Sequence, residues 1–182
     1  ASSSTLSRFE NSISTNDIHK LLIKMIENFV DRYETKPSKI VLDFDPTDYL
    51  VHGEQEKRFY HGYYGGYCYL PMHVFSGDEL VATFLKPSSG DGTKYTGVIL
   101  KLIVNRIRKR WPDMRIVFRG DAGFARKHVL HWCENNHVEY VVGIGGNRVL
   151  QRRVEKEMKD VILKQKESGV DQKKYLSLRY KA

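Results

Sequence analysis

Two acidic clusters, each at the end of an apolar run, constrain the fold of this chain more than any other feature. Ile40, Val41 and Leu42 lead into the first cluster, residues 43–48, and residues 116–118 lead into the second, residues 119–124. Open α/β sheets place their functional sites beyond the carboxyl ends of the strands. Two such strands lying side by side would bring carboxylates together, so the pattern predicts a divalent-metal site at one edge of a sheet.

Length and charge bound the possibilities. The 182 residues suffice for one substantial domain. Lys and Arg total 30 against 22 Asp and Glu, which gives a formal charge of +8 and a pI of about 9.4. Such a balance suits binding to a phosphate backbone, although a soluble protein that is simply basic fits the charge equally well.

Cysteine usage and hydropathy indicate an intracellular chain. The two cysteines, Cys68 and Cys133, do not form a Cys-x-x-Cys motif, and we expect both to be free thiols. No apolar run approaches the ~18–20 residues of a membrane span, and the Ser-rich start lacks the apolar core of a signal peptide.

The first half of the chain predicts a helix followed by three strands. Residues 1–37 are expected to form a helical lead-in, with capping residues at 14–17 and apolar side chains at helical spacing after them. A strand buried on both faces is expected at 39–45. Strands at 67–75 and 79–85, joined by a turn at 76–78, form a hairpin.

The tyrosines between Phe59 and Tyr69 have two interpretations. They could stack on unpaired bases, or they could be ordinary cross-strand partners on either side of a turn near Gly65 and Gly66, and we favour the second.

The second half predicts alternating helices and strands. Apolar residues from Leu100 to Trp111 mark one face of a helix that Pro112 ends. The elements expected after it are a strand at 114–120, a helix at 126–135, a strand at 139–144, a charged helix at 148–167 and an edge strand at 174–180.

This order predicts an α/β fold with a ribonuclease-H-like mixed sheet flanked by helices, occupying residues 38–182. The antiparallel strands come first and the strand–helix crossovers second. In such a sheet the first strand is central and the strand after the first crossover helix lies beside it, so Asp45 and Asp121 become neighbours.

Five linked motifs carry a family resemblance. They are Asp43-Phe44-Asp45-Pro46-Thr47-Asp48, His52-Gly53-Glu54-Gln55, Phe59-Tyr60-His61-Gly62-Tyr63-Tyr64, Cys68-Tyr69-Leu70-Pro71-Met72-His73-Val74-Phe75 and Arg119-Gly120-Asp121-Ala122-Gly123-Phe124. In order and spacing, from about Thr5 to Tyr180, the chain resembles the group 1 DDE transposases of bacterial insertion sequences.

The resemblance implies a DNA-strand-transfer enzyme that uses two Mg²⁺ ions, for which Mn²⁺ can substitute. The first family Asp falls on Asp45, with Asp43 in reserve because strand alternation puts both on one face. The second falls on Asp121. A single Asp after a strand is more often a turn former or helix cap, but finding both in the family context reverses that preference.

The chemistry explains the residue type. Phosphodiester cleavage and strand transfer are in-line displacements, in which two metals ~3.5–4 Å apart activate the attacking hydroxyl and neutralise the leaving oxygen. Mg²⁺ prefers oxygen ligands and keeps several waters, so a few carboxylates suffice.

The third family acid has no counterpart in the expected order. The resemblance places a catalytic Glu on a helix after the last strand, so we expect it beyond Ala182 and expect the chain to be a fragment that cleaves little by itself. Glu155 and Glu157 precede that strand, and we expect them to pair with Arg152, Arg153 or Lys156.

Other polar residues are candidates for contact with nucleic acid. They are His52, Gln55, Arg119, Arg126 and Lys127. Arg119 could hold the Asp121 carboxylate or a phosphate, whereas His61 and His73 are expected to make ordinary hydrogen bonds.

The expected partners are transposon-end and target DNA and a second copy of the protein in a synaptic complex, in a bacterial cytoplasm at the nucleoid. Two other functions stay open: a non-catalytic DNA-binding or assembly module, and a ribonuclease-H-like nuclease.

Overall fold

The computed structural model describes residues 2–86, 88–91 and 93–179. Two compact units make up the chain, Ala1–Ile144 and Gly145–Ala182. The division between a lead-in at 1–37 and a core at 38–182 stays a prediction, although the helix before residue 37 contributes buried side chains to the core of the first unit.

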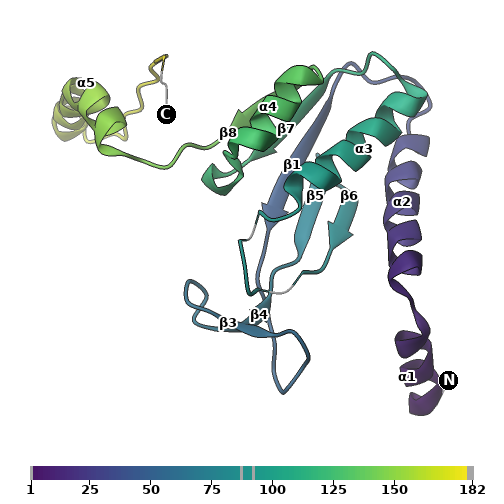
Figure 1. Ribbon diagram of the computed structural model, residues 1–182. Coiled ribbons are helices and arrows are strands. Elements are labelled where there is room, and N and C mark those ends of the chain that lie inside the picture. Colours follow the sequence, from purple (N-terminus) through teal and green to yellow (C-terminus); the bar gives the residue numbers. More distant parts are fainter. Residues whose placement is uncertain (1, 87, 92, 180–182) are drawn as a thin grey trace. The chain divides into compact units, whose positions relative to one another are not determined.

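The first unit is built on a five-stranded mixed sheet (Figure 1). Its strands are β1 (Ile40–Pro46), β5 (Met72–Ser76), β6 (Glu79–Phe84), β7 (Ile116–Gly120) and β8 (Val138–Val142). They lie in the order β6-β5-β1-β7-β8. β5 and β6 are antiparallel, whereas β1, β7 and β8 run parallel. The predicted ribonuclease-H-like arrangement, with the first strand in the centre, is confirmed.

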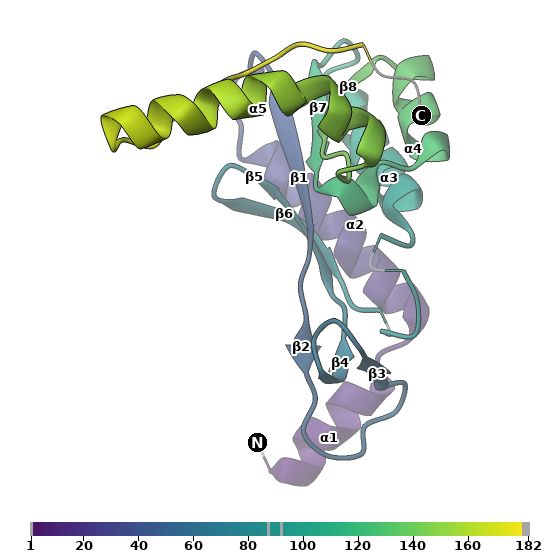
Figure 2. The same cartoon turned by 90° about the vertical axis from the view of Figure 1, so that its left-hand side faces the viewer.

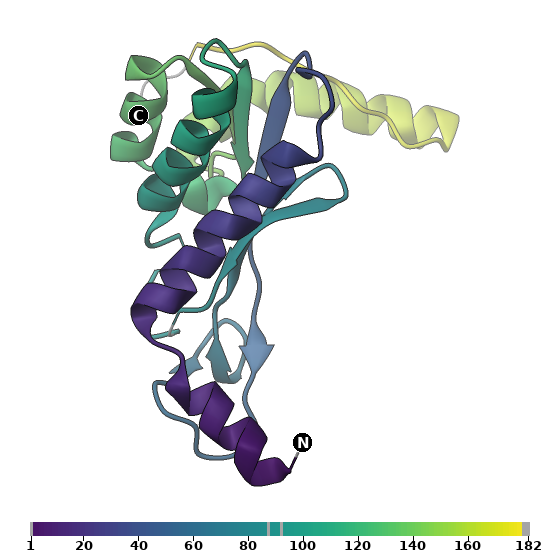
Figure 3. The ribbon, with the colours of Figure 1, turned by 90° about the vertical axis from the view of Figure 1, so that its right-hand side faces the viewer.

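Three helices cover one face of this sheet. α2 (Thr15–Asp31) packs against β6 and against α3 (Thr96–Arg110), and α4 (Lys127–Asn135) packs against β8. Figure 3 shows α2 lying along the sheet. The core between these layers is apolar, as burial of such side chains is the main driving force for folding. Its fully buried members include Ile26, Leu42, Ile103 and Phe118.

Side-chain alternation along β1 separates the two faces of the sheet. Ile40, Leu42 and Phe44 are buried beneath the helices, whereas Asp43 is half-buried and Asp45 exposed on the other face. The strand is therefore buried on one face only, which corrects the expectation of burial on both. The apolar run ends at Leu42, and from Asp43 onward the side chains on the face away from the helices are polar.

The N-terminal helices begin at capping residues. Ser14 and Asp17 form a reciprocal capping box at the start of α2. A further helix, α1 (Ser3–Ser12), begins after the cap Ser2, and every residue in it is exposed, Leu6 and Phe9 included. It lies within the predicted helical lead-in, for which only one start, at residues 14–17, was expected.

A small second sheet extends from the first (Figure 2). It contains β2 (Tyr49–Leu50), β3 (Phe59–His61) and β4 (Gly66–Tyr69) in the order β2-β4-β3. Tyr60 lies opposite Tyr67 with 5.8 Å between ring centroids, as expected for cross-strand partners.

The strand predicted at 67–75 is in fact two strands in different sheets. β4 ends at Tyr69 and β5 begins at Met72. Between them Leu70 N donates to the carbonyl of Lys86 at 3.1 Å, and Pro71 has no N–H to continue a ladder.

The two cysteines are buried free thiols, as predicted. Burial raises the pKa of the Cys133 thiol to about 11. In the described ranges, no helix has the length and hydropathy needed to cross a membrane.

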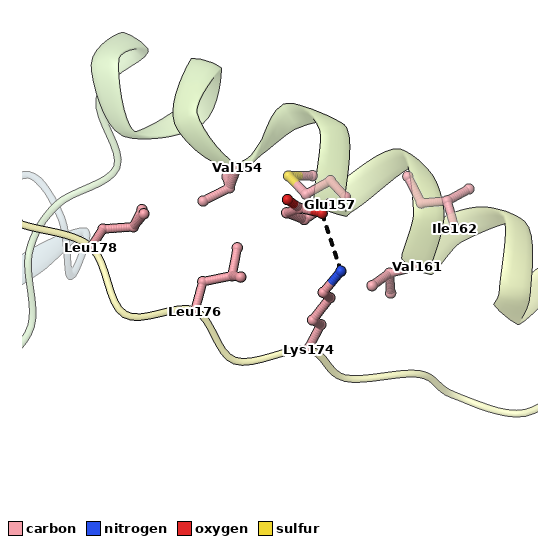
Figure 4. Close-up of a pocket in the computed structure, with 8 residues that line it drawn as sticks. Val154, Glu157, Val161, Ile162, Lys174, Leu176 and Leu178 are labelled. Atoms are coloured by element: carbon pink, nitrogen blue, oxygen red, sulfur yellow. Dashed lines mark hydrogen bonds and ion pairs between the residues drawn. The ribbon is translucent and has the colours of Figure 1, made fainter.

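The second unit contains α5 (Arg148–Ser168), which Asn147 caps and which ends at Gly169 with φ of 68°. The edge strand predicted at 174–180 is wrong over 174–179, which form no strand; Tyr180 lies outside the described residues. Instead Lys174, Leu176 and Leu178 face α5 across a groove of about 380 Å³ (Figure 4). Lys174 Nζ donates to Glu157 Oε2 at 3.1 Å, so side-chain contacts with the helix replace backbone pairing.

Candidate active site

The parallel pairing of β1 with β7 brings the two acidic clusters together. The register runs from Ile40 opposite Ile116 to Asp43 opposite Arg119, a separation of 76 positions. Asp45 and Asp121 have the same separation, so the register, continued past the last paired residues, puts them level with one another. Both are exposed. Asp45 lies near the carboxyl end of β1 and Asp121 directly follows β7, so both lie at the strand ends where the sequence predicted them.

Two residues before Asp45 and Asp121, the residues that face each other, Asp43 and Arg119, form an ion pair. Arg119 donates to both carboxylate oxygens of Asp43, from Nε to Oδ1 and from Nη2 to Oδ2, the latter at 2.6 Å. This bidentate geometry is the strong form of the Arg–carboxylate interaction. The hydrogen bonds that Arg119 donates to Asp43, together with the negative charge of Asp43, raise the pKa of the Arg119 guanidinium. Arg119 therefore holds Asp43, and not Asp121, which was one of its expected partners.

A packed turn holds Asp121. The residue caps the short helix η1 (Ala122–Phe124), and its Oδ1 accepts from Gly123 N at 2.7 Å. Phe124 is fully buried and meets Phe44 and Phe118 with 6.1 Å between each pair of centroids. Gly143 lies so close that a Cβ there would be 2.8 Å from Ala122 N. The position of the Asp121 backbone is thus fixed from two sides.

An ionic network fixes the far side of the same turn. Arg126 Nε donates to Gly123 O at 3.0 Å and to Thr93 Oγ1 at 3.3 Å, and its Nη2 pairs with Asp91 Oδ2. Asp91 Oδ1 accepts from Thr93 N at 2.9 Å and from the Thr93 hydroxyl at 2.8 Å.

Burial and hydrogen bonding shift the pKa values in this network. Burial tends to raise the pKa of Asp91, but the hydrogen bonds from Thr93 and the charges of Arg126 and Lys86 outweigh it and lower that pKa. Lys86 is 4% exposed, and burial lowers its pKa. Sequence reasoning missed Asp91, Thr93 and Lys86, which lie about 30 positions before Asp121 in a loop whose only signal was its turn-forming composition.

The surroundings of Asp45 come from antiparallel pairing. His73 of β5 lies opposite Asp45. Its Nδ1 is 2.8 Å from Thr83 Oγ1, so the expected hydrogen bond of His73 is confirmed. Burial raises the pKa of the Tyr64 phenol, and the charges of Asp48 and Asp45 raise it further. The sequence analysis did not place His73 or Tyr64 beside the acidic site, since neither is near Asp45 in the chain.

The remaining predicted residues are not drawn into these contacts. His52 and Gln55 are exposed in the loop between β2 and β3, and Lys127 is exposed at the start of α4. Glu155 pairs with Lys159 at 2.8 Å and Glu157 with Lys174, which corrects the expected pairing with arginines or Lys156.

The donor set of the site consists of oxygen atoms. Across the described ranges no group of three or more His, Cys, Asp or Glu side chains is arranged to hold a metal ion. Asp45 and Asp121 supply carboxylates on one edge of the sheet, the ligand type that Mg²⁺ prefers over nitrogen or sulfur.

The strand order β6-β5-β1-β7-β8, with one Asp near the end of β1 and another directly after β7, places this chain in the ribonuclease-H-like class of domains. Within that class, the chain belongs to the family described as transposase DDE domain group 1, whose model matches residues 1–182. The family resemblance found in the sequence motifs is confirmed. No curated protein sequence matches the chain.

Several solved structures are distantly similar. The catalytic domain of Mos1 mariner transposase is 12% identical, with a TM-score of 0.42, covering 85% of this chain and 75% of that one. A piggyBac transposase synaptic complex with hairpin DNA is 16% identical, with a TM-score of 0.43, covering 63% and 24%. A Mos1 paired-end complex with the left transposon end is 14% identical, with a TM-score of 0.40, covering 64% and 39%. The chain thus spans well under half of two of these proteins, and TM-scores below 0.5 decide nothing about its chemistry.

Proposed function

We propose that this chain forms the catalytic core of a DNA transposase, in which Asp45 and Asp121 bind Mg²⁺ for DNA strand cleavage and strand transfer. One observation carries the proposal: the parallel register of β1 and β7 makes Asp45 and Asp121 level at the ends of neighbouring strands. Membership of the DDE transposase family supports the reaction type.

The two carboxylates fit a hard divalent cation. Both are exposed, and neither forms an ion pair with a basic side chain in the described part of the chain, so their charges are available to a ligand. Bound metal would activate the attacking hydroxyl and neutralise the leaving oxygen of the phosphodiester. A pair of carboxylates is a small ligand set, and the third acid expected after residue 182 stays a prediction.

The chain's own residues would fix the positions of these ligands. The Asp43–Arg119 ion pair joins β1 to β7 two residues before Asp45 and Asp121. The Gly123 amide donates to the Asp121 carboxylate and so orients it. We propose that Asp43 acts through Arg119 as a positioning residue, while its role as reserve metal ligand is decided by the experiment below.

DNA is the proposed substrate, with transposon ends and target as its two forms and a dimer as the working assembly. The net charge of +8 supports binding to phosphates. Of the proposed contacts, Lys127, His52 and Gln55 are exposed, while Arg119 and Arg126 are already engaged in ion pairs. The alternative function is a non-catalytic DNA-binding role, and what favours it is that no third acidic, His or Cys side chain joins the two carboxylates within the described residues.

Mn²⁺ binding tests the proposal. In crystals of the chain soaked in Mn²⁺, we expect anomalous density between the carboxylates of Asp45 and Asp121, and we expect D45N and D121N each to lose it. D43N should keep it, and D78N, in the turn between β5 and β6, is the matched control. Density that persists in D45N and D121N would overturn the metal assignment, and its loss in D43N would make Asp43 a ligand.

A further inference from the structure

A cavity of about 430 Å³ lies between the loop before α3 and the start of α4. Most of the lining residues carry a polar or charged group, although carbon atoms make up most of the exposed lining surface, and part of the lining is the first turn of α3. The residues used below are Asp91, Thr93, Lys94, Tyr95, Lys101 and Arg126. None of them was assigned to a cavity by the sequence, because they come from two separate segments of the chain, residues 91–101 and the start of α4.

The charges lining this cavity leave an excess of positive charge. Asp91 is paired with Arg126, so these two charges offset each other. Lys94 and Lys101 form no ion pair within the described ranges, and their ammonium groups lie instead over aromatic rings, 5.0 Å from the centroid of Tyr95 and 5.7 Å from that of Trp132. The amino-terminal turn of α3 adds the positive end of the helix dipole.

The cavity shares a wall with the Asp121 turn. A Cβ placed on Gly123 would lie 3.0 Å from Asp121 Oδ1 and 3.1 Å from the methyl of Thr93, which lines the cavity. Arg126, another lining residue, holds both Gly123 O and Thr93 Oγ1. Only the width of one glycine therefore separates the cavity lining from the candidate catalytic carboxylate.

The backbone at Tyr95 is unusual. This bulky residue has φ of 73° at the cap position of α3, without a side-chain capping hydrogen bond. Left-handed backbone in such a residue is an outlier, and outliers of this kind persist where the surrounding structure imposes them, often at ligand sites. At Tyr95 it occurs between the two cavity lysines.

We infer that this cavity binds a phosphate group of the DNA strand whose scissile phosphodiester reaches Asp121, with Lys94 and Lys101 as its cationic contacts. This inference rests on the proposed function and specifies where the same DNA is held beside the site. The two lysines offer point charges to the phosphate oxygens, and each contact releases condensed counterions from the DNA.

The test measures binding of a short fluorescein-labelled DNA duplex to the full chain as a function of NaCl concentration. We expect K101Q and K94Q each to reduce the slope of log K against log[salt] by about 0.9, the value for one phosphate contact. K109Q, on the same helix α3 but away from the cavity, removes the same charge and should leave the slope unchanged. Circular dichroism checks that each variant is folded. If K101Q is unfolded, the slope of K94Q decides the test.

Each outcome decides the inference. Equal slopes in wild type, K101Q and K94Q, an equal decrease in K109Q, or no DNA binding by the wild type would overturn it. The Mn²⁺ experiment is independent: Mn²⁺ density that persists in D45N and D121N, with the lysine effect intact, would refute the metal site while leaving the phosphate site standing. Metal density that depends on Asp45 and Asp121, together with unchanged slopes in K94Q and K101Q, would refute only the phosphate site in the cavity.

Discussion

The two candidate catalytic aspartates are positioned by different means. Asp45 continues a regular strand, and its place follows from backbone pairing of β1 with β5 and β7. Asp121 lies after its strand has ended, and its place depends on the buried ring of Phe124, the close approach of Gly143 and the network around Arg126. Sheet register alone sets the position of Asp45, whereas the position of Asp121 requires tertiary packing against distant parts of the chain, Gly143 and the loop that holds Asp91 and Thr93.

This difference predicts which changes disturb the site. Substitutions around the turn should displace Asp121 while leaving Asp45 in register, and substitutions of equal size in the core away from the turn should lower stability without that local effect.

The largest expected effect is that of F124A. Phe124 is fully buried, so the cavity left behind should cost about 3–5 kcal/mol of unfolding free energy in urea denaturation. F29A, a matched substitution on α2 at 2% exposure, should cost a similar amount, and the ring of Phe29 packs against Tyr33 rather than against the turn. Only F124A should speed hydrogen exchange at the Gly123 amide beyond the change in global stability. Equal exchange in both variants would contradict the distinction between the two aspartates.

An intermediate effect is expected for G143A. A methyl there would meet the backbone of Ala122 at 2.8 Å, and such overpacking costs about 1–3 kcal/mol. Because the turn must move away, Mn²⁺ binding should weaken as well. G62A is the control, since nothing lies within 4 Å of that position. If G143A unfolds at the same urea concentration as G62A and binds Mn²⁺ normally, the turn is not braced by Gly143.

The smallest expected effect concerns pH and Asp91. Its pKa is lowered in the folded state, so Asp91 stabilises the fold above its unfolded pKa of about 3.9, and this contribution is lost as pH falls through the folded value. Thermal midpoints should therefore differ between wild type and D91N at neutral pH and converge at acidic pH. A constant difference across the whole range would show that the Asp91 charge does not stabilise the loop.

The sequence predicted the part of the site that depends on local pattern. Apolar runs ending at residues 42 and 118 indicated the strands, and the family motifs identified Asp45 and Asp121. The partner of Arg119 was not predictable, because it follows from which residues the β1–β7 register sets opposite each other. The contacts of Asp91, Thr93 and Lys86 depend on how a loop packs against a distant turn, and no local pattern encodes that.

The errors in the fold have the same origin. One strand was predicted where Pro71 divides two sheets, and the division of the helical lead-in into α1 and α2 was not predicted. At 174–179 an alternating pattern suggested a strand, but the leucines face α5 instead.

The small sheet has a consequence for the modularity of the domain. Where β1 leaves the main sheet and β5 enters it, Thr47 N donates to Pro71 O at 3.1 Å, so the two chain segments are already joined at the base of the excursion. Residues 49–69 therefore form an insert within what would otherwise be a simple β1–β5 hairpin. An insert closed at its base can change in length without shifting the register that sets the position of Asp45.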